Sequence, residues 1–514
     1  MIRSVSFDVH DLDTFILVGS AVTLLAILAV RVSTGAGLPS LLIYLLMGVA
    51  LGESGVGIQF ENYEVAHAVG FAALAMILAE GGLTTSWSEM RGCIRLGVSL
   101  ATLGVAVSVT VVAIGGHYLL GMPWGLAVLL GAVTSPTDAA AVFSVLRVVP
   151  LPKRLTGTLE AESGLNDAPT VVLVTLISSG AVEDNGVPAM VGIVAYELAI
   201  GVALGLAAGY GGAWLMRRVA LPSSGLYPLA VLTLAFLGYG AATFVHGSGF
   251  AAVYVAALVL GNSDLSHRAA TRSFAEGLAW LSQIGLFVTL GLLLSPGRIS
   301  LSTVGLAIVA GLILTFAARP LSVLVSAVVQ PLPWRELSFV SWAGLRGAVP
   351  IVLTTIPLAE GVDHADRLFD LVFVMVVLFT VLTGPTLPLV ARILRVARRS
   401  EPRGLEVEAA PLERIAADLL QVSIAPSSRM HGVEVGELRL PRGASVSMVI
   451  RDGNTLVPER RTVLRHGDDL LVVTPRKLRW QTEERLRQVS ERGRLAQWLV
   501  ERPARKQPDR PLGP

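Results

Sequence analysis

Three carboxylates stand within a stretch of the chain that is otherwise apolar enough to cross a membrane. Glu160, Glu162 and Asp167 fall in the segment LEAESGLNDAPTVVLV, which runs from residue 159 to residue 174. A charge at the centre of a bilayer costs roughly 2.5–3.5 kcal/mol on insertion scales, so such residues normally face a partner or a water-filled cavity. Carboxylates kept in such a place are suited to binding a cation or a proton.

A helix over this stretch would place its polar residues on two adjoining faces. At about 3.6 residues per turn, Glu160, Ser163 and Asp167 share one stripe, and Glu162 and Asn166 form a neighbouring one. Glu160 would lie near the cytoplasmic end, where hydration by water explains it as well as function does. Asp167 would lie about two turns deeper, so we expect this carboxylate to bind an ion.

Two other apolar stretches are interrupted in a way that suits ion binding. In GAVTSPTDAAAVF, Pro136 removes a backbone donor within a cluster of hydroxyl residues, and Asp138 follows. In SWAGLRGAVPIVL, Arg346 stands between two glycines ahead of Pro350. An ordinary proline kink would explain either stretch alone. Together they predict two broken transmembrane helices, whose free carbonyls and half-helix ends can bind ions.

The whole chain has the composition of a polytopic α-helical membrane protein. Of its 514 residues, 53% are hydrophobic and 15% are charged, and the apolar residues come in long blocks. A net charge of +2 gives no indication of a nucleic-acid surface, and a single cysteine excludes an internal disulfide bond. We predict about 13 transmembrane helices, each near the roughly 20 residues needed to cross a bilayer except the short ninth. Their approximate ranges are 14–32, 37–53, 66–86, 95–115, 124–146, 157–178, 188–215, 227–246, 249–262, 274–295, 303–328, 337–359 and 368–391.

The basic residues and the interruptions give these ranges an orientation and a symmetry. Twelve Lys and Arg residues, Arg319 among them, are assigned to odd-numbered loops and two to even-numbered loops. The odd loops are therefore predicted to be cytoplasmic, with the N-terminus outside and the C-terminus inside. The two interrupted ranges are seven apart, and an odd offset inverts the topology, so two halves would form an inverted repeat. Such a pair of interrupted helices indicates a secondary transporter.

The composition changes at Ser400. We divide the chain into a transmembrane domain at 1–398, a linker at 399–418, a small α/β domain at 419–475, and an amphipathic helix with a disordered end at 476–514. Strands are predicted at LLQVSIAP, ASVSMVIRDG and HGDDLLVVTP, with a short helix at GVEVGELRL. A domain of about 60 residues buries little surface alone, which favours pairing with a second copy.

The motifs SPTD, ESGLND and GLRGAVP, in this order, resemble those of the NhaP-type monovalent cation:proton antiporters over about residues 14–395. Residues 405–475 resemble the C-terminal subdomain of RCK/TrkA regulators of potassium transport. The combination looks like the NhaP/CvrA-type potassium/proton antiporters of bacteria. The resemblance implies an NhaA-like fold with two broken crossing helices, a homodimer in the bacterial inner membrane, and a cytoplasmic RCK-C domain. It also implies a part in pH homeostasis and cell volume regulation.

The resemblance implies a role for each polar residue of the first two motifs. Asp167 would bind the proton and the cation in turn, and Thr137 and Asp138 would line the crossing of the broken helices. Glu162 and Ser163 would complete the ion shell, partly through water. The transported cation is the only metal expected, with Asp167, Ser163, Thr137 and Glu162 as its ligands.

Three further residues follow from the same resemblance. Asn166 would precede the key carboxylate as in electroneutral members, since electrogenic relatives carry an Asp there. Arg346 would be a fixed positive charge paired with Glu162 or Glu80. Glu80, in AMILAEGGLTT, matches a glutamate of the third span less securely.

These residues predict a secondary antiporter that exchanges cytoplasmic potassium or sodium for external protons, one for one, by alternating access. A proton and a cation would compete for Asp167, while Glu162 would stay ionised beside Arg346. No cofactor is expected, because the tail lacks a glycine-rich nucleotide-binding half. A small nucleotide or cyclic dinucleotide at a dimer interface of the tail would regulate transport; a dimerisation module without a ligand is the alternative.

Three rival functions differ from this one. A sodium-selective antiporter would use the same residues, and the tail alone favours potassium. RCK-type tails also gate cation channels, but the chain has no TVGYG-like filter. A membrane enzyme is disfavoured, because GSGF at 247–250 is a poor match to a nucleophile elbow.

Overall fold

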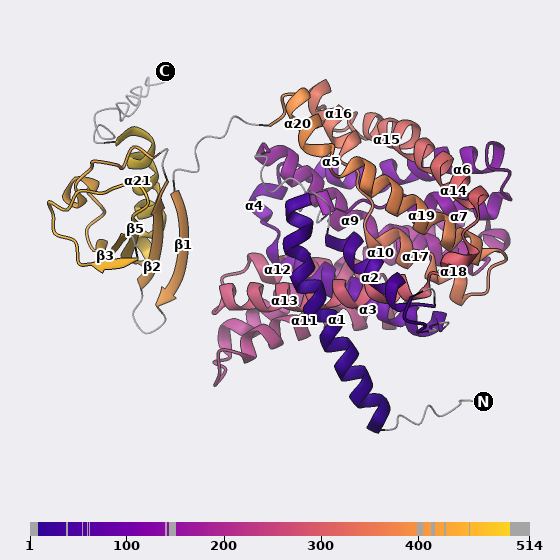
Figure 1. Cartoon of the computed structure of the whole chain (residues 1–514), viewed down its shortest axis with the longest axis horizontal. Coiled ribbons are helices and arrows are strands. Elements are labelled where there is room, and N and C mark those ends of the chain that lie inside the picture. Colours follow the sequence, from indigo (N-terminus) through magenta and orange to yellow (C-terminus); the bar gives the residue numbers. More distant parts are fainter. Residues whose placement is uncertain are drawn as a thin grey trace, which may run out of the picture. The chain divides into compact units, whose positions relative to one another are not determined.

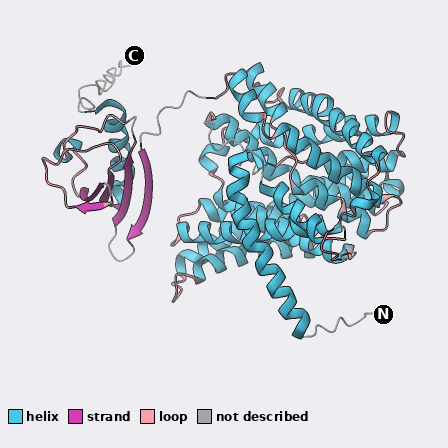
Figure 2. Cartoon of the chain, in the orientation of Figure 1, coloured by secondary structure: helices cyan, strands magenta, loops and turns pink. Residues whose placement is uncertain are grey.

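The chain divides into two compact units, Met1–Ala397 and Arg398–Pro514, here called the helical domain and the C-terminal domain. The computed structural model describes residues 9–36, 40–53, 55–58, 60, 62–138, 141–142, 151–397, 405–412, 417–425, 428–451 and 453–493. Figure 1 labels their elements, and Figure 2 shows that the first unit is helical while the second contains the strands.

The helical domain forms helices in each of the thirteen predicted apolar ranges. A segment in hydrocarbon must satisfy its backbone groups internally, and a helix does so. In chain order the helices are α1 Val9–Ala36, α2 Ser40–Leu51, α3 Tyr63–Thr84, α4 Trp87–Met90, α5 Ile94–Ser99, α6 Val105–Tyr118, α7 Trp124–Thr134, α9 Lys153–Ser178, α10 Ala181–Arg218, α11 Leu226–Phe244, α12 Gly249–Asn262, α13 Arg268–Leu293, α14 Leu301–Leu312, α15 Arg319–Ser326, α16 Trp334–Trp342, α17 Ala348–Leu353, α18 Thr355–Ala359, α19 Ala365–Thr383 and α20 Leu387–Ile393.

Several of these helices can cross a membrane by length and composition. Among the described residues, six helical stretches meet that condition, and α19 with α20, bent by 47°, makes a seventh. Five more apolar helices are shorter, and α9, which is 26 residues long, carries the carboxylates. The helical domain is therefore a multi-pass membrane domain, and the total of about 13 spans stays a prediction.

Both predicted interruptions are present. Helix α7 ends at Thr134 and residues 135–138 are not helical, and residues 343–347 separate α16 from α17. The fourth and eleventh apolar ranges also share a feature, since each contains a π-helical segment, η1 Leu100–Gly104 and η3 Ile313–Ala318. Thus two pairs of ranges that are seven apart carry matching irregularities.

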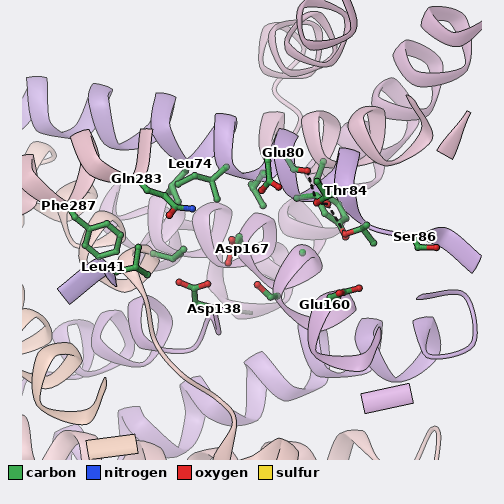
Figure 3. A pocket seen from close by; sticks show the side chains of 18 of the residues that line it. Leu41, Leu74, Glu80, Thr84, Ser86, Asp138, Glu160, Asp167, Gln283 and Phe287 are labelled. Carbon is green, nitrogen blue, oxygen red and sulfur yellow. Dashed lines mark hydrogen bonds between the residues drawn. The ribbon is translucent and has the colours of Figure 1, made fainter. Parts of the chain in front are cut away.

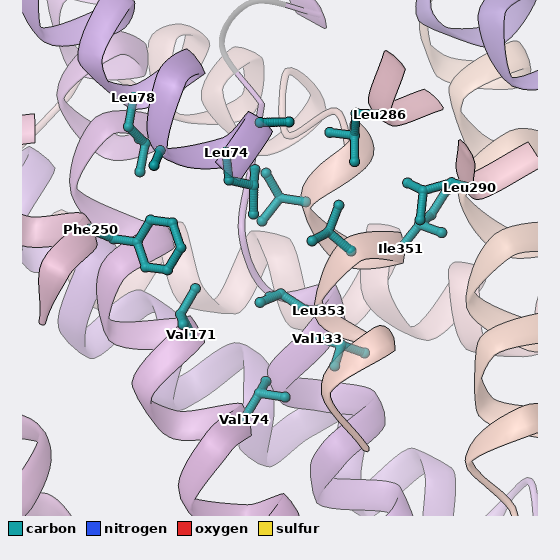
Figure 4. Packing of buried hydrophobic residues seen from close by; sticks show 14 of the residues in the cluster. Leu74, Leu78, Val133, Val171, Val174, Phe250, Leu286, Leu290, Ile351 and Leu353 are labelled. Atoms are coloured by element: carbon teal, nitrogen blue, oxygen red, sulfur yellow. The ribbon is translucent and has the colours of Figure 1, made fainter. Parts of the chain in front are cut away.

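The helices pack mainly within two groups. Bundle A consists of α2, α3 and α10 to α13, and bundle B of α5 to α7, α9 and α14 to α19 with η1 and η3. In bundle A, α2 and α13 approach closely because Gly48 and Gly291 face each other; a Cβ on Gly48 would lie 2.2 Å from the carbonyl oxygen of Val288. Apolar side chains fill the space between the bundles, as Figure 4 shows for Leu74 of α3 and Val171 of α9.

The C-terminal domain is a five-stranded antiparallel sheet in the order β1-β2-β5-β3-β4. Its elements are β1 Leu405–Leu412, β2 Ala417–Ile424, η4 Val435–Leu438, β3 Ser445–Arg451, β4 Asn454–Leu456, β5 Asp469–Pro475, η5 Arg476–Leu478 and α21 Arg479–Arg492. Residues alternate between buried and partly buried along β2 and β5, as expected of strands with one covered face.

Most of the elements predicted for this domain are confirmed, with one correction. The range 399–418, expected to be a linker, contains strand β1 and the start of β2, because residues 405–412 pair in register with β2. The short helix at GVEVGELRL is a single 3₁₀ turn, η4. The predicted disordered end lies outside the described residues.

Candidate functional site

The two interruptions meet and satisfy each other. The backbone N–H of Asp138 donates to the carbonyl of Leu345 at 2.9 Å, and Nε of Arg346 donates to the carbonyl of Thr134 at 2.8 Å. A helix that stops within a membrane leaves its last carbonyls without intrahelical partners. Each broken range therefore supplies a group that the other one lacks, and this reciprocal bonding holds the crossing together.

The crossing depends on a glycine of the GLRGAVP motif. A Cβ at Gly347 would lie 1.8 Å from Oδ2 of Asp138, which is far closer than two non-bonded atoms can approach. Oδ1 of Asp138 accepts a hydrogen bond from the backbone N–H of Ala141 at 3.1 Å, in the manner of a helix N-cap. The carboxylate of Asp138 is thus fixed at the point where the two interruptions cross.

Helix α9 brings the ESGLND residues to this crossing. Nδ2 of Asn166 donates to Oγ1 of Thr137 at 3.0 Å, which ties α9 to the first interruption. Asp167 is only 7% exposed. Among the described residues, neither Oδ1 of Asp167 nor Oδ1 of Asn166 has a hydrogen-bond partner. A buried carboxylate oxygen without a partner is costly, and a proton or a bound cation would remove that cost.

A cavity of about 400 Å³ reaches Asp167 from between the two bundles. Figure 3 shows Asp138, Glu160 and Asp167 on one side of it, Leu74, Glu80 and Gln283 on the other, and Phe287 beside Leu41 at one end. Ser163 also lines the cavity, and so do Ser86 and Glu89, which follow the C-terminal end of α3. The sequence-predicted residues Asp138, Ser163, Asp167 and Glu80 thus share one space, and so does Glu160.

Glu162 points elsewhere, and its predicted partner was wrong. Both of its carboxylate oxygens accept hydrogen bonds from the guanidinium of Arg319, the second at 2.9 Å, and Arg319 also donates to the carbonyl of Val340. Glu162 is 2% exposed and Arg319 is 4% exposed, and Glu162 is not among the residues that line the cavity. Glu162 is therefore ion-paired with Arg319, away from the cavity, and not with Arg346.

Arg319 is the residue that the sequence analysis missed. It was assigned to a cytoplasmic loop, yet it starts α15 inside the continuous helical stretch Leu301–Ser326 and is buried. Its position within the apolar range 303–328 was the available signal, because a buried arginine in such a range requires a carboxylate partner.

Arg346 serves the crossing itself. Its Nη1 donates to the carbonyl of Gly344 at 2.6 Å, and its own carbonyl accepts from Oγ1 of Thr380 at 3.0 Å. Within the described part of the chain, Nη2 has no hydrogen-bond partner. The guanidinium lies at the C-terminal end of α7, where a positive charge is favoured by the helix dipole. Among the described residues, the guanidinium of Arg346 is thus bonded to backbone carbonyls at the crossing, and no bond to Glu80 is formed.

Comparison with known families matches both domains. Residues 20–393 match the model of the transmembrane sodium/hydrogen exchangers, and residues 419–479 match the TrkA-C domain. The K(+)/H(+) antiporter NhaP2 of Shewanella oneidensis is 34% identical over 91% of this chain and 83% of its own length. The K(+)/H(+) antiporter NhaP of Alkalimonas amylolytica is 36% identical over 89% of this chain and 80% of its own.

Two more distant proteins are also similar. The Na(+)/H(+) antiporter ApNhaP of Aphanothece halophytica is 28% identical over 76% of this chain and 77% of its own length. The solved structure of the sodium proton antiporter MjNhaP1 from Methanocaldococcus jannaschii superposes with a TM-score of 0.63 at 22% identity, covering 74% of this chain and 99% of that one. The latter likeness concerns the fold of the helical domain.

Proposed function

The chain belongs to the sodium/hydrogen exchanger family and is a cation:proton antiporter, and we propose that it exchanges cytoplasmic potassium for external protons. Potassium is supported by the relatives at 34% and 36% identity, both potassium/proton antiporters, whereas the sodium/proton relative is 28% identical. One observation carries the exchange mechanism: Oδ1 of Asp167, which lines the cavity, receives no hydrogen bond from any described residue.

Competition for Asp167 would couple the two fluxes. An ionised carboxylate without a partner is expensive to move through a hydrophobic barrier, whereas the protonated acid or a carboxylate–cation pair carries no net charge. Only the loaded forms would then pass between the two access states, so one proton moves one way for each cation moving the other way. Asn166 is uncharged and bonded to Thr137, which supports a single exchangeable charge and an electroneutral 1:1 stoichiometry.

The lining of the cavity suits an alkali cation. Such cations are hard and take oxygen ligands, and Asp138, Ser163 and Asp167 supply carboxylate and hydroxyl oxygens there. Glu80 and Glu160 line the same cavity and would raise the local concentration of cations. Thr137, first expected to be a ligand, would act indirectly through Asn166. Glu162, also expected to be a ligand, would instead stabilise the helical domain through its ion pair with Arg319.

Alternating access is supported by a difference between the two ends of the bundle interface: one end is open to the cavity, and the other is held by polar contacts. The cavity reaches the C-terminal end of α3, and two polar contacts lie at its N-terminal end. His67 of α3 bonds to Thr355 of α18 across the bundles at 3.2 Å, and Arg298, in the connection between α13 and α14, pairs with Asp370 of α19 at 3.4 Å. We call these two contacts the outer latch. Helix α3 has 22 residues, about 33 Å at 1.5 Å per residue, so the cavity and the outer latch lie at opposite ends. The distribution of Lys and Arg would place the cavity on the cytoplasmic side.

An inverted repeat would supply the symmetry for two access states. The interruptions after Thr134 and Trp342 and the π-helical segments η1 and η3 recur at an offset of seven ranges, as an NhaA-like arrangement of repeats requires. The N-terminus would then be outside and the C-terminus in the cytoplasm of a bacterium, with residues 1–398 in the inner membrane.

The tail would regulate this exchange. The TrkA-C match at residues 419–479 supports a regulatory domain that pairs with a second copy and binds a small nucleotide or cyclic dinucleotide between the copies. Such a dimer would give the transporter a homodimeric form. Deletion of residues 405–514 should therefore change the response of exchange to pH or to added nucleotide; an unchanged response would leave only a dimerisation role.

Dye dequenching in everted vesicles tests the proposed function. A pH-sensitive dye reports the loss of an imposed proton gradient after potassium or sodium is added, each alone and across a range of pH. A response to potassium that needs the proton gradient supports the proposal. A response to sodium alone would make the protein a sodium/proton antiporter, and potassium flux without proton movement would indicate a channel.

A further inference from the structure

Gln283 is a polar residue in an apolar part of α13. The surrounding sequence is WLSQIGLFVTL, and the neighbours Ile284, Leu286 and Phe287 are buried in the apolar core. A carboxamide in a membrane-spanning helix loses its hydration unless it faces a partner or a water-filled space. Gln283 lines the cavity that reaches Asp167 and is partly exposed there.

The side chain of Gln283 has no partner among the residues that the structure describes. Within the described residues, its carboxamide makes no hydrogen bond and no ion pair. Two other polar groups of the cavity do have partners: the Tyr254 hydroxyl lies against the sulfur of Met90, and the Thr84 hydroxyl donates to the backbone of Glu80. Gln283 thus presents one oxygen acceptor and one amino group to the contents of the cavity.

Gln283 and the ion-binding carboxylates belong to different bundles. Gln283 is on α13 of bundle A, whereas Asp167 is on α9 of bundle B and Asp138 lies in the interruption that follows α7 of the same bundle. Figure 3 shows the carboxamide directed into the space that the two carboxylates border from the other side. The cavity that Asp167 lines therefore also contains a neutral oxygen acceptor from the other bundle.

We propose that the carboxamide oxygen of Gln283 is a ligand of the transported cation and makes the site prefer potassium to sodium. The proposal rests on the proposed antiport function and adds a specificity-determining residue to it. Gln283 is neutral and does not titrate, so it acts on the cation and leaves proton binding to the carboxylates. This separates its effect from that of every carboxylate in the cavity.

The preference follows from the number and kind of oxygens. A potassium ion is larger than a sodium ion and surrounds itself with more ligands, and neutral carbonyl oxygens are the ligands that potassium channels use. Loss of one neutral oxygen should therefore weaken potassium binding more than sodium binding. Because Gln283 lies on bundle A, it contributes only in the access state in which Asp167 faces α13.

The test compares Gln283→Leu with the adjacent Ser282→Ala in everted vesicles. Ser282 is also partly buried but does not line the cavity, so it controls for a general disturbance of α13. For Gln283→Leu, KM for potassium should rise at least about tenfold, as for the loss of one contact to a charged group. KM for sodium should rise less, and the pH at which the KM profile bends should not move. Gln283→Asn, which keeps a shorter carboxamide, should lie between the wild type and Gln283→Leu.

Two results would overturn the proposal. One is an unchanged potassium-to-sodium ratio of KM in Gln283→Leu; the other is a shift of the bend in the pH profile, which would mean that Gln283 acts by altering the carboxylates. A second measurement needs no flux: potassium should raise the melting temperature of the purified wild-type protein more than that of Gln283→Leu. If the wild type showed no exchange but this difference were present, the antiport proposal would fail while the assignment of Gln283 as a ligand would hold.

Discussion

Two buried aspartates, one in each domain, are bonded in opposite ways. In the C-terminal domain, Asp468 is fully buried and accepts two hydrogen bonds from the guanidinium of Arg451 and one from the backbone N–H of Arg465, at 2.7–2.8 Å. In the helical domain, Asp167 is almost as buried, but its Oδ1 receives no hydrogen bond from any described residue. The same functional group is saturated in one place and left incomplete in the other.

The saturated carboxylate is structural. Burial raises the pKa of Asp468, but the hydrogen bonds from Arg451 and Arg465 outweigh it and hold that pKa below its usual range. Such a group stays ionised and holds the loop before β5 against β3. The carboxylate of Asp167 is suited to reversible binding instead, because a proton or a cation can supply the missing partner and leave again.

A third carboxylate shows that the membrane environment alone does not leave Asp167 incomplete. Glu162 lies on the same helix, α9, and is bonded through both oxygens by Arg319. One helix therefore carries a saturated carboxylate on the face toward bundle B and an incomplete one toward the cavity. We infer that the paired face of α9 stabilises the domain and that the unpaired face binds the exchanged ions. The following predictions test this difference.

Replacing the incomplete carboxylate should have the largest effect. Asp167→Asn keeps the shape of the side chain but can neither hold a proton nor neutralise a cation, so proton exchange in everted vesicles should fall to the background of vesicles without the protein. The variant should still insert, since it removes a costly charge. Asp468→Asn is the matched control and should keep the catalysed exchange. Substantial cation-dependent proton flux in Asp167→Asn at any pH would contradict this assignment.

Breaking the saturated pair in the helical domain should damage stability more than transport. Arg319→Leu leaves Glu162 buried without its cation, which should cost about 3–5 kcal/mol and lower the melting temperature in detergent. The double variant Arg319→Leu/Glu162→Leu removes both charges and should recover most of that loss. KM for the cation should change little in the double variant, since Glu162 does not line the cavity. Equal destabilisation of the single and double variants would show that the pair is not a unit.

Most of the local structure could be predicted from the sequence, and the partners could not. Each apolar range forms helix, and both interruptions follow from local chemistry, since proline removes a donor and glycine allows the close approach at Gly347. The family inferred from SPTD, ESGLND and GLRGAVP is confirmed by the match over residues 20–393. These signals are short-range, so a single sequence contains them.

The errors concern contacts between distant segments. Glu162 and Arg319 are 157 residues apart, and nothing local distinguishes Arg319 from Arg346 as the partner. Strand β1 was taken for a linker, because residues 405–412 become a strand only by pairing with β2. The cavity wall formed by α13 was missed for the same reason, because Gln283 lines the cavity only once the fold brings α13 opposite α9.

Asp468 should give the C-terminal domain a stability that depends on acid. Because its pKa is lower in the folded chain than in the unfolded chain, it stabilises the fold at neutral pH, and that contribution is lost as the pH falls below 3.8 and through the folded pKa. Asp468→Asn leaves Arg451 with an unmatched charge and should cost about 1–3 kcal/mol at neutral pH. Hydrogen exchange of the β5 amides should be measured in the full-length wild type and in Asp468→Asn, with correction for the intrinsic effect of pH. The difference in stability between the two proteins should become smaller as the pH falls. A difference that persists at low pH would point to lost packing instead.

Opening the outer latch should have the smallest effect, and its sign should depend on the side from which it is measured. Side-chain exposure is 39% for Arg298 and 8% for Asp370, so the pair is worth about 0.2–1 kcal/mol, or at most about fivefold in a population. Arg298→Ala should shift the protein away from the state with the cavity open at α3. KM for the cation in everted vesicles should then rise by that factor, because fewer molecules present Asp167 to that side. In right-side-out vesicles KM should fall, since the opposite state gains population.

Asp370→Asn combined with Arg298→Ala should add little to either single variant, because each removes the same contact. Equal shifts on both sides would mean that Arg298 acts on the binding site and not on the balance between the two access states.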